Sequence, residues 1–214
     1  MADLDYVYGK VGAPSALQGE ATRVPIRLAK TGETAFCNTH GFYHEMTSRG
    51  NTFAVCNQTG VASQAGLSAT TPILTLYNPI GSGVNLSLIY AGVSQMVAAA
   101  AAAAVFLAAN TNTAAAAVTG TATTAHRSGL LGGGTPKATP LLAATLPAAP
   151  VAIDVLGALL TGAITTTPGV QAIGKFYDGS VILKENTAIS IQTSTASGAL
   201  GLLATFIWEE VPNA

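Results

Sequence analysis

The chain has 214 residues, of which 49% are hydrophobic and only 9% are charged. An average globular protein has about 25% charged residues, so the chain is poor in charge without having the composition of a disordered protein. Its formal net charge of −1 gives no general attraction to nucleic acid or to an anionic membrane, and we expect neither as a partner.

The charges are concentrated at the amino-terminal end. Ten of the nineteen charged residues lie within residues 1–49, whereas the 77 residues of 50–126 have none. A monomeric soluble domain usually carries a mixed, charged surface. We therefore expect an assembly component, with residues 1–50 as an extended N-terminal arm and residues 51–214 as a β domain largely covered by other subunits.

The arm is expected to hold the contacts to a protein partner. Pro25 confines the short extended piece 22–28 to a sheet edge or an arm. Basic side chains near it would meet acidic groups of the partner, and aromatic side chains farther along would be apolar anchors. The expected partner-binding residues are Arg23, Arg27, Lys30, Phe36, Phe42 and Tyr43.

Beyond residue 50, runs of apolar and β-branched residues, several of them alternating with polar ones, predict strands. Residues 73–77 and 84–93, joined by the turn-forming segment 78–83, predict a β-hairpin. Asp178-Gly179 predicts a second turn and residues 184–186 a third. The other predicted strands are 52–55, 151–156, 174–177, 181–183, 188–193 and 204–211.

The alanine-rich stretch around residues 98–104 leaves helix, loop and strand open. Alanine favours helix by propensity, yet no capping box opens the stretch, so we expect a loop or one helical turn leading into a strand at about 103–109.

Residues 87–109 are uncharged and long enough to span a bilayer, but they are mostly alanine and include Gln95, so we expect no transmembrane helix. Residues 1–8 are acidic and have no apolar run, so we expect no signal peptide.

No group of residues predicts a metal site. His40 and His44 are four apart and could form a weak site with Glu45 or Cys37, but we expect them to be polar contacts of the arm. Cys37 and Cys56 form no metal-binding pattern, and we expect two free thiols in a reducing compartment.

The sequence also lacks a catalytic signature, and we expect no enzyme activity and no cofactor. Glu209 and Glu210 are adjacent, so in a strand they point to opposite faces and cannot act as a catalytic pair. The glycine-rich segments 81–83 and 132–134 lack the Lys-Ser/Thr of a P-loop, and there is no nucleophile elbow of the GxSxG type.

Several motifs together resemble those of tailed-bacteriophage structural proteins. They are PIRLAKTGE (25–33), GFYHE with RGNTFAVCNQTG (within 41–60), LTLYNPIGSGVNLSL (74–88) and DGSVILKENTAISIQT with FIWEEVP (within 178–212). The resemblance implies a non-enzymatic virion protein with a β-sandwich or jelly-roll body, assembled in the host cytoplasm. Within this class we favour a capsid cement, or decoration, protein that binds the major capsid protein and other copies of itself as a homotrimer.

Two other functions are weighed against this one. A head-fibre, tail or baseplate protein would bind host glycans through a shallow aromatic site around Tyr77, Tyr90 or Trp208. A cupin-type enzyme would need clustered histidine and carboxylate ligands, and His126 is the only histidine after residue 50, which nearly excludes it.

Overall fold

A computed structural model describes residues 41–64, 66–96, 99–111, 117–123, 126–159, 171–196 and 201–213. The chain divides into two units, Met1–His44 and Glu45–Ala214, and residues 41–44 are the described part of the first. Most of the expected arm, residues 1–40, therefore lies outside the described residues.

The described part of the chain is built almost entirely from strands. A short helix, α1 (His44–Ser48), precedes them, and Gly50 follows it with a φ of 77°, a conformation that suits glycine after a helix. The strands are β1 (Thr52–Cys56), β2 (Leu74–Asn78), β3 (Val84–Gln95), β4 (Ala103–Thr111), β5 (Thr119–Ala122), β6 (His126–Ser128), β7 (Thr139–Thr145), β8 (Val151–Leu159), β9 (Gln171–Leu183), β10 (Thr187–Thr193) and β11 (Leu202–Pro212).

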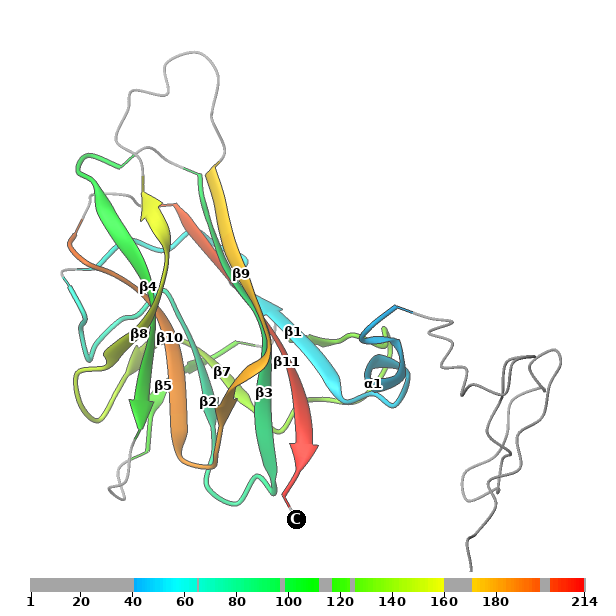
Figure 1. Cartoon of the computed structure of the whole chain (residues 1–214). Helices are drawn as coiled ribbons and strands as arrows, with labels where there is room; N and C mark the ends of the chain where they lie inside the picture. Colours follow the sequence, from blue (N-terminus) through cyan, green and yellow to red (C-terminus); the bar gives the residue numbers. More distant parts are fainter. Residues whose placement is uncertain are drawn as a thin grey trace, which may run out of the picture. The chain divides into compact units, whose positions relative to one another are not determined.

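The strands form two antiparallel sheets within Glu45–Ala214 (Figure 1). Sheet A has the order β6-β1-β11-β3-β9, and sheet B has the order β5-β7-β2-β10-β4-β8. Side chains from the facing sides of the two sheets form one hydrophobic core. The all-β sandwich predicted from the sequence is confirmed.

Strand β11 shows how the core is built. Its side chains alternate between buried and half-buried positions along most of its length, as expected for a strand with one face on the core. Phe206 and Trp208 are fully buried, and the Trp208 ring stacks on Phe53 of β1 with a centroid distance of 5.9 Å. The predicted strand 204–211 is thus confirmed, and its register decides which residues belong to the core.

The same alternation separates two adjacent acids on β11. Glu210 is buried, and its Oε1 accepts hydrogen bonds from the backbone N–H of Lys137 (2.8 Å) and of Ala138 (2.9 Å). The indole N–H of Trp208 lies 3.4 Å from the same oxygen. Glu209 points to the opposite, outer face, where burial raises the pKa of its carboxyl group. As the sequence predicts, the two acids do not form a pair.

The outer face of sheet B is covered by the chain itself. Every residue of β2, and all of β10 after Thr187, is buried, so these strands have no open face. Part of the cover is the segment between β1 and β2, which is held by Gln192: the Ser68 N–H donates to Gln192 Oε1 (2.9 Å), and Gln192 Nε2 donates to the Ser68 carbonyl (3.0 Å). Ala69 then packs on a small second core that includes Tyr77 and Leu141.

The predicted hairpin of residues 73–93 is wrong, although both of its strands exist. β2 belongs to sheet B and β3 to sheet A, so the loop between them crosses from one sheet to the other. The turn 184–186 between β9 and β10 crosses in the same way. The buried Asn78 side chain joins the two crossings, since its Nδ2 donates to the carbonyls of Val84 (2.8 Å) and Leu183 (3.1 Å). The buried leucines of β2 and β3 belong to the same hydrophobic core, but they reach it from opposite sheets and are not neighbours within one sheet.

The predicted turn at Asp178-Gly179 is also wrong, because β9 continues through it. Between the paired positions Leu88–Val181 and Tyr90–Phe176, β3 advances by two residues and β9 by five. The extra residues form a bulge in which Asp178 and Gly179 have φ values of 47° and 85°. The turn-forming dipeptide therefore bends a strand instead of ending it.

Other predictions for the middle of the chain have mixed outcomes. The strands predicted at 103–109 and 151–156 are confirmed as β4 and β8, and residues 100–102 form no regular element before β4. Strands β5, β6 and β7 were not predicted, because their residues are mostly small or polar and show little alternation of apolar with polar residues.

The Glu210 contacts lead to a stability prediction. Glu210→Ala should lower the free energy of unfolding by about 2–3 kcal/mol, because it leaves two backbone N–H groups without their acceptor. Urea denaturation can be followed by the fluorescence of Trp208, the one tryptophan of the chain, which is fully buried. Glu209→Ala is the matched control, and we expect it to change stability by no more than about 0.5 kcal/mol. Equal losses in the two variants would contradict the structural role of Glu210.

Candidate functional site

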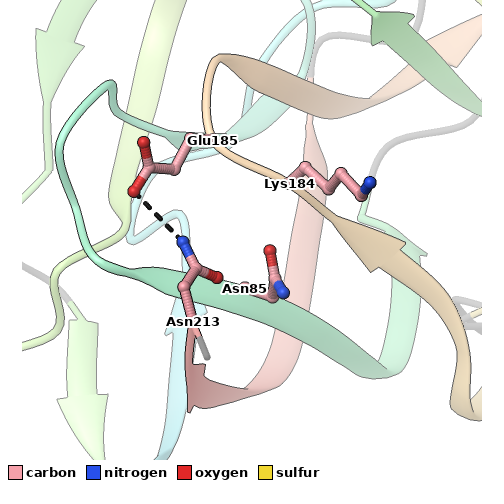
Figure 2. A pocket seen from close by; sticks show the side chains of 4 residues that line it. All are labelled: Asn85, Lys184, Glu185 and Asn213. Atoms are coloured by element: carbon pink, nitrogen blue, oxygen red, sulfur yellow. Dashed lines mark hydrogen bonds between the residues drawn. The ribbon is translucent and has the colours of Figure 1, made fainter.

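A polar depression of about 430 Å³ lies where the ends of several strands meet, and its lining residues are Asn85, Lys184, Glu185 and Asn213 (Figure 2). Asn85 belongs to β3, Lys184 and Glu185 to the turn between β9 and β10, and Asn213 directly follows β11. The depression is shallow and open to solvent.

Glu185 connects three segments of the chain at this depression. Its carboxylate accepts hydrogen bonds from the N–H groups of Gly83 (2.8 Å) and Gly81 (3.1 Å) and from Asn213 Nδ2 (3.2 Å). Both glycines have positive φ values, 70° and 76°, which other residues rarely adopt. The two N–H groups lower the pKa of Glu185, with Gly83 as the larger cause. Since Lys184 points away from this carboxylate in Figure 2, the arrangement is a structural clamp and not an acid–base pair.

An apolar groove of about 250 Å³ includes residues of the same turn. Its lining includes Ile153 of β8, Val181, Ile182 and Leu183 of β9, and residues 187–189 of β10. Lys184 also lines it, so the groove and the polar depression adjoin at this residue. The groove is lined mainly by apolar side chains and suits an apolar side chain of a partner.

Three polar side chains connect β8 to β9. Asp154 Oδ2 accepts hydrogen bonds from Lys175 Nζ and from the Tyr177 hydroxyl, both at 2.7 Å. The bond from Lys175 is the main reason why the pKa of Asp154 is lowered. Burial, followed by the bond to Asp154, raises the pKa of Tyr177 well above its usual value, so this hydroxyl stays protonated and cannot serve as a base. No sequence pattern indicates this cluster, because none shows that β8 and β9 are neighbours.

The outer face of sheet A carries an open aromatic pair. Tyr90 of β3 is half-buried, and its ring centroid lies 5.0 Å from that of Phe176 of β9, which is 64% exposed. The Tyr90 ring lies over Gly92 and Gly174, where a Cβ atom would collide with it. Tyr77 and Trp208, the other aromatic residues considered for a glycan site, are buried. Tyr90 is therefore the one of the three that a surface ligand could reach.

The predicted partner-binding residues fall mostly outside the described part of the chain. Arg23, Arg27, Lys30 and Phe36 lie within residues 1–40, so their contacts stay a prediction. Phe42 is 71% exposed, and its ring meets that of Tyr43 edge to face at 4.8 Å. Both aromatic residues lie in the turn before α1.

The described residues contain no cluster of three or more side chains that could hold a metal ion. Cys56 is a half-buried free thiol, while His40 and Cys37 lie outside the described residues. No helix in the described part of the chain is long and apolar enough to cross a membrane. Residues 87–95, which belong to the uncharged stretch 87–109, form part of strand β3.

No protein-family model, no curated protein and no solved structure matches the chain. The resemblance to phage structural proteins therefore rests on the sequence motifs alone.

The Asp154 cluster leads to a prediction that depends on pH. Because the folded-state pKa of Asp154 lies below its ordinary value of 3.8, its bonds stabilise the fold above that pH and are lost as the pH falls through the folded pKa. Asp154→Asn should therefore cost about 1 kcal/mol at pH 7, and the cost should shrink below about pH 4.

The control for this prediction is Glu209→Gln on the outer face of β11, where burial raises the pKa of the carboxyl group, so its effect should not follow the same pH course. Urea midpoints for both variants at several pH values provide the measurement. A cost of Asp154→Asn that stays constant from pH 7 to pH 3 would show that the charge of Asp154 is not what matters.

Proposed function

We propose that the chain is a non-enzymatic structural protein of a tailed-bacteriophage virion. Within that class we propose a capsid cement, or decoration, protein that binds the shell of the major capsid protein and other copies of itself. It would be assembled into the virion in the host cytoplasm, without a nucleic acid or a membrane as its partner.

The observation that carries the proposal is a group of exposed, large apolar side chains on two neighbouring edge strands. β8 and β9 end their respective sheets, and the bonds that Lys175 and Tyr177 of β9 donate to Asp154 of β8 hold them together. Large apolar side chains that stay exposed on edge strands offer surface for contacts with another protein. The side chains, which are 47–68% exposed, are Val151, Ile153, Val155, Phe176 and Ile182.

The charge pattern supports the same proposal. The described β body has few charges, and several of them serve the fold: Glu210, Glu185 and the Asp154–Lys175 pair all make internal hydrogen bonds. Burial of apolar surface contributes about 25 cal/mol per Å² and needs no charge, so it is the natural driving force for attaching such a body. A protein that binds the assembled shell but not free subunits shifts the assembly equilibrium toward the shell, which is how a cement protein stabilises a capsid.

A second candidate function is favoured by the open aromatic pair. Tyr90 and Phe176 lie on an uncovered sheet face, and aromatic rings on such a face can stack against sugar rings. A head-fibre, tail or baseplate protein with a glycan-binding β domain would use them in this way. The cement protein is preferred, because the side chain that pairing places beside Tyr90 on β11 is Ile207, which offers sugar hydroxyls no hydrogen-bond partner.

The copy number in purified virions tests the proposal. Particles from an infected culture can be separated on a density gradient, and the chain can be quantified against the major capsid protein by mass spectrometry. A cement protein that covers the shell should give a molar ratio of roughly one, because a site repeats with each shell subunit. A few copies per particle would favour the tail or fibre function, and absence from particles would overturn the virion proposal.

The basic cluster of the arm leads to a separate prediction. Arg27→Glu in the full chain should weaken attachment to particles, and the loss should be larger at low salt than at high salt because salt screens exposed ion pairs. Binding to particles from which the chain has been stripped can be measured by sedimentation at several salt concentrations. Lys10→Glu makes the same change in net charge outside the cluster and should have less effect. Equal losses in the two variants would mean that overall charge, and not the cluster, governs attachment.

A further inference from the structure

The outer face of sheet A stays largely open in the described part of the chain, although α1 covers its edge at β1, where Thr52 is buried and accepts a hydrogen bond from Thr47. On β11, the alternate side chains from Leu203 to Glu209 are half-buried, whereas their neighbours in the sequence are buried in the core. On β9, Phe176 and Ile182 are 64% and 60% exposed. The outer face of sheet B differs, because its central strands β2 and β10 are buried on both sides.

The open face is apolar at its centre. Strand pairing places Ile207 beside Tyr90, and Tyr90 beside Phe176, so three large apolar side chains lie across neighbouring strands. Outside the bulge of β9, alternation places two charged side chains on this face, Glu209 of β11 and Arg127 of β6. Outside the bulge the face therefore has one acid and one base, and exposed Asp178 in the bulge adds a second acid, so charge is sparse on the face that the two copies would share.

The edges of the two sheets are poor places for association. A strand of another chain can pair with a sheet edge only where that edge is long and regular, and a bulge interrupts the regular edge. Among the described strands, β8 has two irregularities in its pairing with β4, β9 has the bulge at Asp178-Gly179, and β5 has one irregularity. The fourth edge strand, β6, is three residues long. The edges are therefore disfavoured, and the open face of sheet A offers another route for association.

The size of the face fits a pair of chains. With about 3.4 Å per residue and about 4.8 Å between strands, the five strands present roughly 700 Å² of flat area. A standard protein–protein interface buries about 800 Å² on each partner. A flat, apolar sheet is also complementary to itself, since two such sheets pack face to face about 10 Å apart.

We propose that two copies of this chain associate through the outer faces of their A sheets, around a two-fold axis, with Tyr90, Phe176, Ile182 and Ile207 at the centre of the interface. A two-fold axis brings the same surface from each copy into contact, so one apolar face suffices for both. The pairing depends on this face alone and holds whether or not the chain belongs to a virion.

Light scattering after size exclusion tests this proposal with the full chain. From about 1 to about 100 μM, the mass should reach about 43 kDa, twice the chain mass of 21.4 kDa. Phe176→Lys and Ile182→Lys should each weaken dimerisation by about tenfold or more, because each places a charge in an apolar interface. Val155→Lys is the matched control: it changes an equally exposed residue of an edge strand, but in sheet B, and should leave the dimer intact.

Buried Trp208 reports whether each variant folds, so a folded variant that is monomeric would support the interface directly. A wild-type chain that stays at 21.4 kDa up to about 100 μM would overturn the proposal. A mass of three chains would overturn the two-fold arrangement, and equal weakening by Val155→Lys would overturn the assignment to sheet A. If the wild-type chain is monomeric and Phe176→Lys abolishes its retention on immobilised bacterial polysaccharide, the face is a glycan site instead.

Discussion

The register of β11 is the constraint on which the rest of the structure depends. One set of alternate residues, including Phe206 and Trp208, forms the core, and the other set forms the open face of sheet A. A slip of one residue would exchange the two sets, placing Trp208 in solvent and Glu209 in the core. The buried Glu210 carboxylate opposes such a slip, because only the observed register brings it to the N–H groups of Lys137 and Ala138.

The sequence was sufficient to predict the strands with strong apolar patterns, but not how they pair. Alternation is a local property, and residues 84–93 and 204–211 show it clearly, so both were predicted as strands. Pairing depends on where a chain turns, and the segment 78–83 has the same composition whether it closes a hairpin or crosses between sheets. The crossing depends on the buried Asn78 amide, whose partner Leu183 is 105 residues away in the sequence. No local pattern reveals such a contact.

The same limit applies to the candidate surfaces. Positive φ values at Asp178 and Gly179 are as compatible with a bulge as with a turn, and only the pairing of β9 with β3 distinguishes the two. The Asp154–Lys175 pair depends on two edge strands meeting across the sandwich, which the sequence does not encode locally. The aromatic residues illustrate the point in another way: Tyr77, Tyr90 and Trp208 were equivalent candidates in the sequence, and burial separates them.

The scarcity of charge gives the structure and the proposed function a common physical basis. In the β body, the carboxylates of Glu210, Glu185 and Asp154 accept bonds from the chain's own donors, so they fix the fold and offer little to a partner. Contacts made by the body must then depend mainly on apolar burial, which salt does not screen. Contacts made by a basic arm would depend on charge and would weaken as salt increases. The part of attachment that depends on the arm would thus respond to ionic strength, whereas apolar association between copies and apolar contacts of the body with a partner would not.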